Sequence, residues 1–165
     1  MRRLVLLVLF ALPLVAQENI TLTADDKAKV VKLTHALEAD PLAADARESR
    51  IWLVNMLTQT SDPNVVVCAD LFTDLLNDKN YKYRSELIAQ PIFGQGAYLI
   101  EHPDANDKAT ETFVEGIKSL LKVYEGFVAK DPKGAKRTYL DKLVAARGKD
   151  ALTAWVEEHL APCRK

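Results

Sequence analysis

Apolar residues in this 165-residue chain recur at steps of three and four positions and rarely alternate with polar ones. This spacing places side chains on one face of an α-helix, whereas alternation is typical of a half-buried β-strand. The run Val65–Val67 is the stretch most prone to form a strand, yet Leu71, Phe72 and Leu75 continue its apolar pattern at helical spacing. We therefore predict an all-α protein.

Four prolines each stand where a helix is expected to begin, because proline is tolerated in the first helical turn. They are Pro41, Pro63, Pro103 and Pro132. The predicted helices cover residues 24–38, 42–58, 64–77, 83–101, 106–130, 133–147 and 150–160. Because the loops between them are short, we expect a single-domain bundle of six or seven mostly antiparallel helices.

We make more specific predictions for two of these helices. In the helix over 42–58, we expect Ile51, Val54 and Leu57 to face the core, because residues at three-residue steps share a helix face. In the helix over 83–101, we expect an interruption around Pro91 and the following glycines. Proline lacks the backbone N–H that a helix interior uses, and glycine weakens such an interior.

The first sixteen residues predict export. Arg2 and Arg3 precede an apolar stretch, Leu4–Val15, and the small residue Ala16 follows it. This order is typical of a secretory signal peptide, and twelve apolar residues are too few to span a bilayer, which takes about 20. We expect a signal peptide over 1–16, cleavage near Ala16, and a single helical domain over 17–165 without a membrane span. The mature protein would then lie in the periplasm or outside the cell.

Charge and cysteine content narrow the classes of function. Residues 17–165 carry 20 Lys and Arg against 23 Asp and Glu, a net charge of −3, which argues against a nucleic-acid partner. The two cysteines, Cys68 and Cys163, are expected to form a disulfide if the chain is exported. The alternative is a buried Cys68 with a free Cys163. No Cys-x-x-Cys pair indicates thiol exchange chemistry.

No dense catalytic or metal-binding motif is present in the sequence. The histidines His35, His102 and His159 are spread over the chain, and no serine lies in a Gly-x-Ser-x-Gly turn. Glu158, His159 and Cys163 are close in sequence, but a disulfide would consume the thiol. We therefore expect no metal site and no cofactor.

The segment 83–101 is the best candidate for a functional site. Apolar residues surround most of this helix, which predicts a central position, and yet it carries Glu86 and Glu101. A carboxylate beside a cleft could act as an acid or a base. The expected lining of such a pocket is Gln90, Gly94, Gly96 and Tyr98. Alternatively, Glu86 and Glu101 form ion pairs with Arg50, Arg84 or a lysine at the helix ends, and the small residues let a neighbouring helix approach closely.

The segment 130–149 is basic, with a net charge of +5. An anionic partner could use this stretch, although such runs are often the solvated face of a helix. The residues expected to form that surface are Lys133, Lys136, Arg137, Lys142 and Arg147.

The order of several short segments along the chain resembles that in a known class of proteins. These segments are Asp40-Pro41-Leu42, Arg50-Ile51-Trp52, Val67-Cys68, Glu86-Leu87, Tyr98-Leu99-Ile100-Glu101-His102-Pro103, Leu120, Tyr124 and a C-terminal cysteine. This layout resembles small exported all-helical bacterial proteins of unknown function, and it implies an envelope location without assigning any catalytic residue. Pro162-Cys163 and the glycine-tyrosine cluster also resemble bacterial immunity proteins that neutralise exported toxins, although those usually carry more cysteines.

These observations favour a non-enzymatic binding or interaction module in the bacterial envelope, with an unknown protein or small molecule as its partner. One alternative is a small periplasmic enzyme that uses Glu86 or Glu101 beside the glycine-containing helix. Another is a toxin-neutralising protein of the immunity type, and a third is a structural envelope protein that oligomerises through an apolar helix face.

Overall fold

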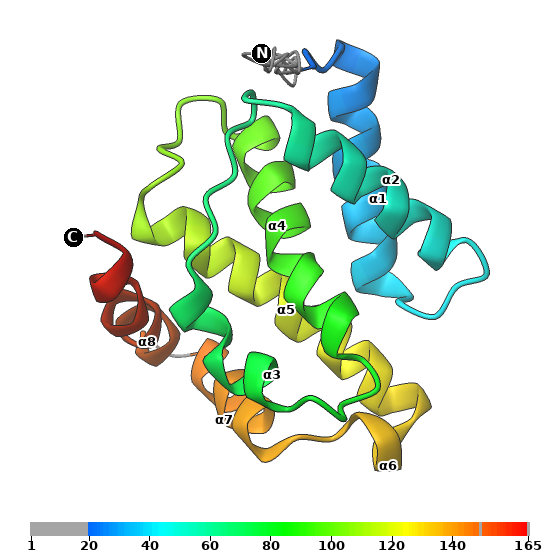
Figure 1. Ribbon diagram of the computed structural model, residues 1–165, viewed down its shortest axis with the longest axis vertical. Coiled ribbons are helices and arrows are strands. Elements are labelled where there is room, and N and C mark those ends of the chain that lie inside the picture. Colours follow the sequence, from blue (N-terminus) through cyan, green and yellow to red (C-terminus); the bar gives the residue numbers. More distant parts are fainter. Residues whose placement is uncertain (1–19, 149, 165) are drawn as a thin grey trace, which may run out of the picture.

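The computed structural model describes residues 20–148 and 150–164, and helices joined by short connections make up most of this part of the chain (Figure 1). The helices are α1 (Ala24–Ala39), α2 (Ala46–Gln59), α3 (Thr73–Asn77), α4 (Arg84–Glu101), α5 (Thr110–Lys130), α6 (Pro132–Ala135), α7 (Thr138–Arg147) and α8 (Ala151–Leu160), with two 3-10 turns, η1 (Ala69–Phe72) and η2 (Ala161–Arg164). The prediction of an all-α bundle is confirmed. The predicted signal peptide, residues 1–16, lies outside the described residues.

Helices α4 and α5 run through the middle of the molecule, with α1 and α2 on one side and α7 and α8 on the other (Figure 1). Two apolar clusters fill the interior. One lies between α1, α2 and α4 and includes Val30, Leu53 and Phe93. The other includes Leu87 of α4 and most of the buried face of α5. Because α4 supplies side chains to both clusters, it is the central helix that the sequence predicted.

The contact between α4 and α5 depends on small residues. A Cβ added at Gly94 would lie 2.4 Å from the Cβ of Ser119, and one added at Gly116 would lie 2.9 Å from the Pro91 carbonyl oxygen. Real Cβ atoms do not approach that closely, so a side chain at either position would push the helices apart. Gly96 plays the same part against α2, where Leu57 occupies the space. The close approach suggested by the sequence is therefore found at these glycines.

The expected interruption of the helix over 83–101 is wrong. Helix α4 is continuous from Arg84 to Glu101 and contains Pro91 in its interior. Proline in a helix interior costs roughly 3 kcal/mol, but most helical stability in proteins comes from packing of the apolar surface. Burial of α4 against both clusters overrides the local preference of Pro91.

The predicted helix over 64–77 exists only in its second half. Residues 64–68 have no regular structure, the backbone at Cys68 is extended, and helical turns begin at Ala69. The valines at 65–67 favour extended backbone, because β-branched side chains lose rotamer freedom in a helix. Here the preference of the valines prevails over the helical spacing of the residues that follow them.

Helix α2 is rotated relative to the prediction. Leu53 and Leu57 are buried as part of the core, whereas Ile51 and Val54 are exposed. Only Leu57 of the three residues predicted to face inward does so. The helix also begins at Ala46 instead of residue 42, because residues 40–46 form consecutive turns with backbone bonds from Ala43 to Asp40 and from Ala46 to Ala43.

Two further boundaries differ from the prediction. Helix α5 begins at Thr110, four residues later than expected, after a loop in which the Lys108 N–H donates to Asn106. The segment 133–147 divides into α6 and α7, because Lys136 and Arg137 are extended. The Tyr124 hydroxyl accepts the Arg137 N–H at 2.9 Å and stabilises this break.

Cys68 and Cys163 form a disulfide, as predicted, which ties the start of η1 to the end of the chain. Asp70 lies beside this pair, and the three residues are the only group of three potential metal ligands among the positions that the structure describes. The sulfur atoms of Cys68 and Cys163 are bonded to each other, so neither cysteine is a thiolate that could bind a metal. None of the helices in the described ranges is both long and apolar enough to cross a membrane.

Candidate functional site

The structure separates the residues expected to form one site on α4. Glu101, Gly94 and Tyr98 line a cleft of about 370 Å³ between α1, α4 and α5. Glu86 lies elsewhere on the helix and lines a different hollow, between α2 and α4. The two candidate carboxylates therefore belong to different sites.

The two remaining residues of the expected pocket are part of the interior. Gln90 is fully buried, and its side-chain amide donates to the Ser119 hydroxyl at 3.0 Å. Gly96 is buried against Leu57 of α2. Neither residue lines the cleft that Glu101 occupies.

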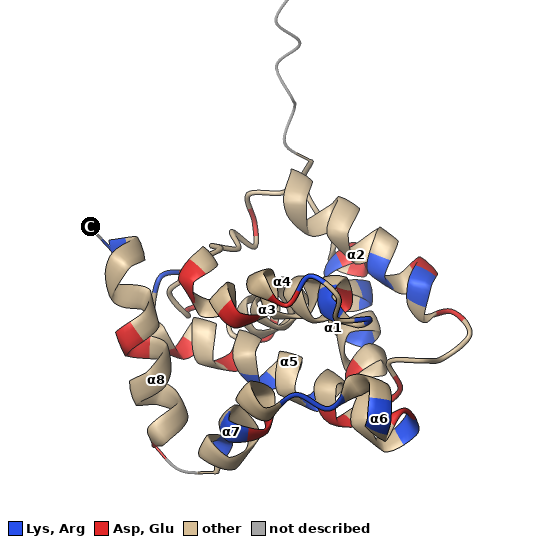
Figure 2. Ribbon diagram, turned by 60° about the horizontal axis from the view of Figure 1, so that its bottom comes forward, with Lys and Arg blue, Asp and Glu red and all other residues tan. Residues whose placement is uncertain are grey.

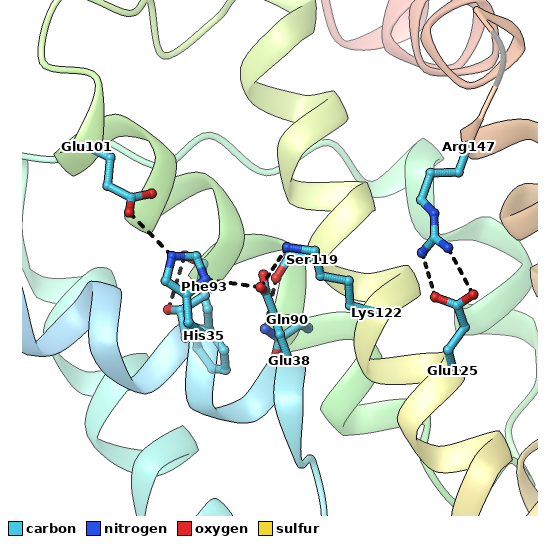
Figure 3. Close-up of polar contacts among 10 residues, drawn as sticks. His35, Glu38, Gln90, Phe93, Glu101, Ser119, Lys122, Glu125 and Arg147 are labelled. Atoms are coloured by element: carbon cyan, nitrogen blue, oxygen red, sulfur yellow. Dashed lines mark hydrogen bonds and ion pairs between the residues drawn. The ribbon is translucent and has the colours of Figure 1, made fainter.

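His35 of α1 connects two carboxylates in the cleft between α1, α4 and α5 (Figure 3). Its Nδ1 lies 3.0 Å from Glu38, and its Nε2 lies 3.3 Å from Glu101. Both ring nitrogens can donate at once only when the imidazole is protonated. The hydrogen bond to Glu38 is the main reason that the pKa of His35 is raised, although partial burial opposes it.

Glu38 is the most enclosed charged group of this cleft, with only 9% of its side chain exposed. Burial by itself raises the pKa of this carboxyl, but hydrogen bonds from Lys122, Ser119 and His35 outweigh burial and lower it. The Lys122 ammonium lies 2.8 Å from the same carboxylate. Glu38 is therefore ionised near neutral pH and satisfied by three partners.

This arrangement joins three helices, α1, α4 and α5, through charged side chains. Both nitrogens of His35 are occupied, so the ring has no free position to take a proton from a substrate. The Ser119 hydroxyl is buried and bonded to Gln90, which excludes it as an exposed nucleophile. Glu101 is exposed and paired with His35, a partner other than the arginines and lysines that the sequence suggested for it.

The α2–α4 groove is the hollow with the most apolar character near α4, and its volume is about 530 Å³. Its lining residues are Arg47, Arg50, Ile51, Val54, Asn55, Ser85, Glu86 and Ala89. Ile51 is 52% exposed and Val54 is 37% exposed. These two residues are three positions apart on α2 and so lie next to each other on the helix surface.

Two arginines give the α2–α4 groove a positive rim. Within the described ranges, neither Arg47 nor Arg50 forms an ion pair closer than 4 Å. Arg50 donates one bond of 2.7 Å to the Pro41 carbonyl, and its buried Nε has no partner. Burial lowers the pKa of the Arg50 guanidinium, and the charge of Glu86 acts in the opposite direction. Glu86 accepts a bond from Ser85 and is the one carboxylate that lines the groove.

The basic segment is less available than its composition suggests. Arg147 forms a two-bond ion pair with Glu125, at 2.5 and 2.9 Å (Figure 3). Arg137 pairs with Asp78 at 2.6 Å. Figure 2 shows Lys and Arg in blue along α6 and α7, with Asp and Glu in red among them. Both arginines of the expected surface are thus engaged within the protein.

The three lysines of that surface are more exposed. Lys133 and Lys142 are exposed, and Lys136 lies 3.9 Å from Asp141, a loose contact. Without the two arginines, these lysines form a weaker anionic-partner surface than the sequence predicted.

The sequence did not identify the network around Glu38 or the exposed pair Ile51 and Val54. The spacing of His35 and Glu38, three residues apart, indicates a helix-surface pair but not its link to Ser119 and Lys122 on α5. The exposure of Ile51 depends on which face of α2 meets α4, and periodicity alone assigned the wrong face. Comparison of the chain with protein-family models, curated proteins and solved structures gave no match.

Proposed function

We propose that this protein is a non-enzymatic binding module that works in the bacterial envelope after export, and that it holds a partner protein in the α2–α4 groove. The pattern of residues 1–16 supports export, and a disulfide is compatible with an oxidising compartment. The observation that carries the binding site is the pair of exposed aliphatic side chains, Ile51 and Val54, in a hollow.

The exposure of this pair favours a contact that removes it from water. Single apolar residues are common on protein surfaces, but adjacent ones in a concave surface with a polar rim are typical of interaction sites. A short helical segment laid into such a groove would bury its own apolar residues against Ile51 and Val54. Helix-in-groove binding fits the shape of this hollow, which two helices form.

The rim specifies the charge of the partner. Arg47 and Arg50 face the groove without an ion-pair partner within the described ranges. A guanidinium matches the planar geometry of a carboxylate and can donate two parallel bonds to it. We therefore expect the bound segment to carry an Asp or Glu beside its apolar residues.

A peptide selection with defined variants tests this proposal. The oxidised protein is used to select binders from a displayed library of helical peptides, and the affinities of the selected peptides are then measured. We expect acidic, amphipathic peptides, and we expect Ile51→Asp to weaken their binding at least tenfold, which corresponds to about 1.4 kcal/mol. Arg47→Glu should reduce the association rate and the salt dependence of binding.

Val67→Asp is the matched control, because Val67 is an exposed aliphatic residue outside the groove. This variant should bind the selected peptides as the wild type does, and circular dichroism should show that all three variants are folded. Selection of peptides that bind Ile51→Asp and the wild type equally would contradict the proposal. So would a preference for basic peptides.

A further inference from the structure

A further hollow lies between η1, α3, α5, α7 and α8, and its volume is about 340 Å³. We call it the α8 pocket. Its apolar walls include Leu71, Leu75, Tyr139, Leu143, Trp155 and Pro162. A mostly apolar hollow of this size lies at the lower end of the range for small-molecule sites, about 300–1,000 Å³.

The polar lining of the α8 pocket is acidic. Asp70, Asp74 and Glu158 line it together with Thr73 and His159, and no Lys or Arg does. Each of the other hollows noted in the described part of the chain has at least one Lys or Arg in its lining. Within the described ranges, no basic group lies within 4 Å of the three carboxylates, so none of them is held in an ion pair.

The rings of Trp155 and His159 also line the α8 pocket. Trp155 is half-buried, and the ring of His159 stacks on it with a centroid separation of 4.2 Å. His159 is held by a contact of 2.8 Å between its Nδ1 and the Trp155 carbonyl oxygen. Faces of aromatic rings attract organic cations, and indole does so most strongly. The walls therefore combine apolar area, aromatic faces and negative charge.

The disulfide fixes the two sides of this pocket relative to each other. Cys68 precedes Asp70 and Leu71 on one wall, and Cys163 follows Pro162 on the other. Because the bridge joins segments 95 positions apart in sequence, these walls are held in place before any ligand arrives. Preorganisation of this kind reduces the conformational entropy lost on binding.

We propose that the α8 pocket binds a small amphiphilic organic cation, such as an aromatic or alkyl amine. The ammonium group lies near Asp70, Asp74 and Glu158, and the apolar part packs on Leu75, Leu143 and Trp155. A hollow of about 300 Å³ adjoins the pocket, shares Asp74, Tyr139, Leu143 and Trp155 with it, and is also lined by Lys142. Asp70 and Glu158 do not line that second hollow, so the positive end of the ligand lies on their side of the pocket, away from Lys142. This site is separate from the α2–α4 groove and does not depend on the function proposed for it.

Three probes of equal size and different charge test the proposal. They are 2-naphthylmethylammonium, 2-naphthylmethanol and 2-naphthoate. Binding is followed by the fluorescence of Trp155 in the oxidised Trp52→Phe protein, in which Trp155 is the one remaining tryptophan. We expect the cation to bind at least tenfold more tightly than the alcohol, and the carboxylate to bind most weakly. Added salt should reduce the difference.

Neutralised variants identify where the charge acts. Exposed ion pairs are individually weak, so the three carboxylates are neutralised together: the triple variant Asp70→Asn, Asp74→Asn, Glu158→Gln should weaken binding of the cation about tenfold and leave the alcohol unchanged. The matched control is the triple variant Asp25→Asn, Glu48→Gln, Glu157→Gln, whose positions are exposed and do not line the pocket. Equal binding of the three probes, no binding at millimolar concentration, or an equal loss in both triple variants would each overturn the proposal.

Discussion

Glu38 is a largely buried carboxylate that joins α1 to α5 through Lys122 and Ser119, and to α4 through His35 and Glu101. A buried carboxylate is costly unless its oxygens are hydrogen-bonded, and this one has three donors. The network thus fixes the relative positions of three helices with groups that no sequence motif marks. His35 is the member of this network whose pKa is raised from an ordinary value near neutral pH.

Replacement of His35 should make the stability of the protein less dependent on pH. The pKa of His35 is raised above the ordinary value of 6.5, first by Glu38 and then by Glu101. Its contribution is therefore complete below pH 6.5 and is lost as the pH rises through the raised pKa of the folded state. We expect His35→Gln to cost about 0.5 kcal/mol at pH 6, because solvent screens a half-exposed pair, and close to nothing at pH 9.

Urea unfolding at pH 6 and pH 9 measures this difference directly. The control is His102→Gln, since His102 stacks on Tyr98 and contacts a backbone carbonyl instead of a carboxylate. Its cost should not increase toward pH 6. A cost of His35→Gln that grows toward pH 9 would show that the ring stabilises the fold as a neutral group.

At the scale of elements, the sequence predicted where several helices lie better than how the helices pack on one another. Helices α1, α4 and α8 lie within two residues of their predicted bounds, because proline and capping residues mark their ends. The helix predicted over 64–68 and the inward face predicted for α2 were wrong. At 64–68 the preference of the valines for extended backbone prevailed over the helical spacing of the residues that follow. The face of α2 that enters the core depends on tertiary contacts, in which Leu53 is buried and Ile51 and Val54 are not. Such contacts leave no periodic pattern in one chain.

The candidate site shows the same limit at finer resolution. The segment 83–101 was correctly expected to lie at the centre, and a cleft does lie against Gly94. The sequence could not show that Glu86 and Glu101 lie in different hollows. Which hollow each of these two carboxylates lines depends on how α1, α2 and α5 pack around α4.

The contact between α4 and α5 gives a test at this scale. Gly94→Ala places a Cβ 2.4 Å from the Cβ of Ser119 and 2.9 Å from its hydroxyl oxygen. Because a Cβ atom moves only with its backbone, the helices must separate, and we expect a loss of roughly 1–3 kcal/mol in the free energy of unfolding. Denaturant unfolding at neutral pH checks this value.

Gly148→Ala is the control for the intrinsic effect of the substitution. A Cβ at Gly148 meets nothing within 4 Å, and its φ of −81° suits any residue. This variant should be unchanged or stabilised by about 0.4–1 kcal/mol, because alanine restricts the unfolded chain. If Gly94→Ala were equally harmless, the close approach of α4 and α5 would not be required for the fold.

For the whole molecule, the two apolar clusters share α4, and the disulfide spans the cluster that contains α8. The bridge encloses η1, α3 and all helices from α4 to α8, so it links the first and last elements of that cluster. Cys68 is buried within the cluster, whereas Cys163 is exposed on η2. A reductant can therefore reach the bridge from the Cys163 side without unfolding of the core.

Loss of the bridge should destabilise the protein and leave its helical fold in place. Removal of a disulfide that closes a long loop typically costs about 2–5 kcal/mol, largely because the unfolded chain gains freedom. We expect Cys68→Ala, Cys163→Ala to unfold at lower denaturant concentration than the oxidised wild type and to match the reduced wild type, since both lack the same constraint. Mass spectrometry under non-reducing conditions verifies the bridge in the starting material. Reduced and oxidised wild type with the same midpoint would mean that packing of α8 on α5 already supplies the order attributed to the disulfide.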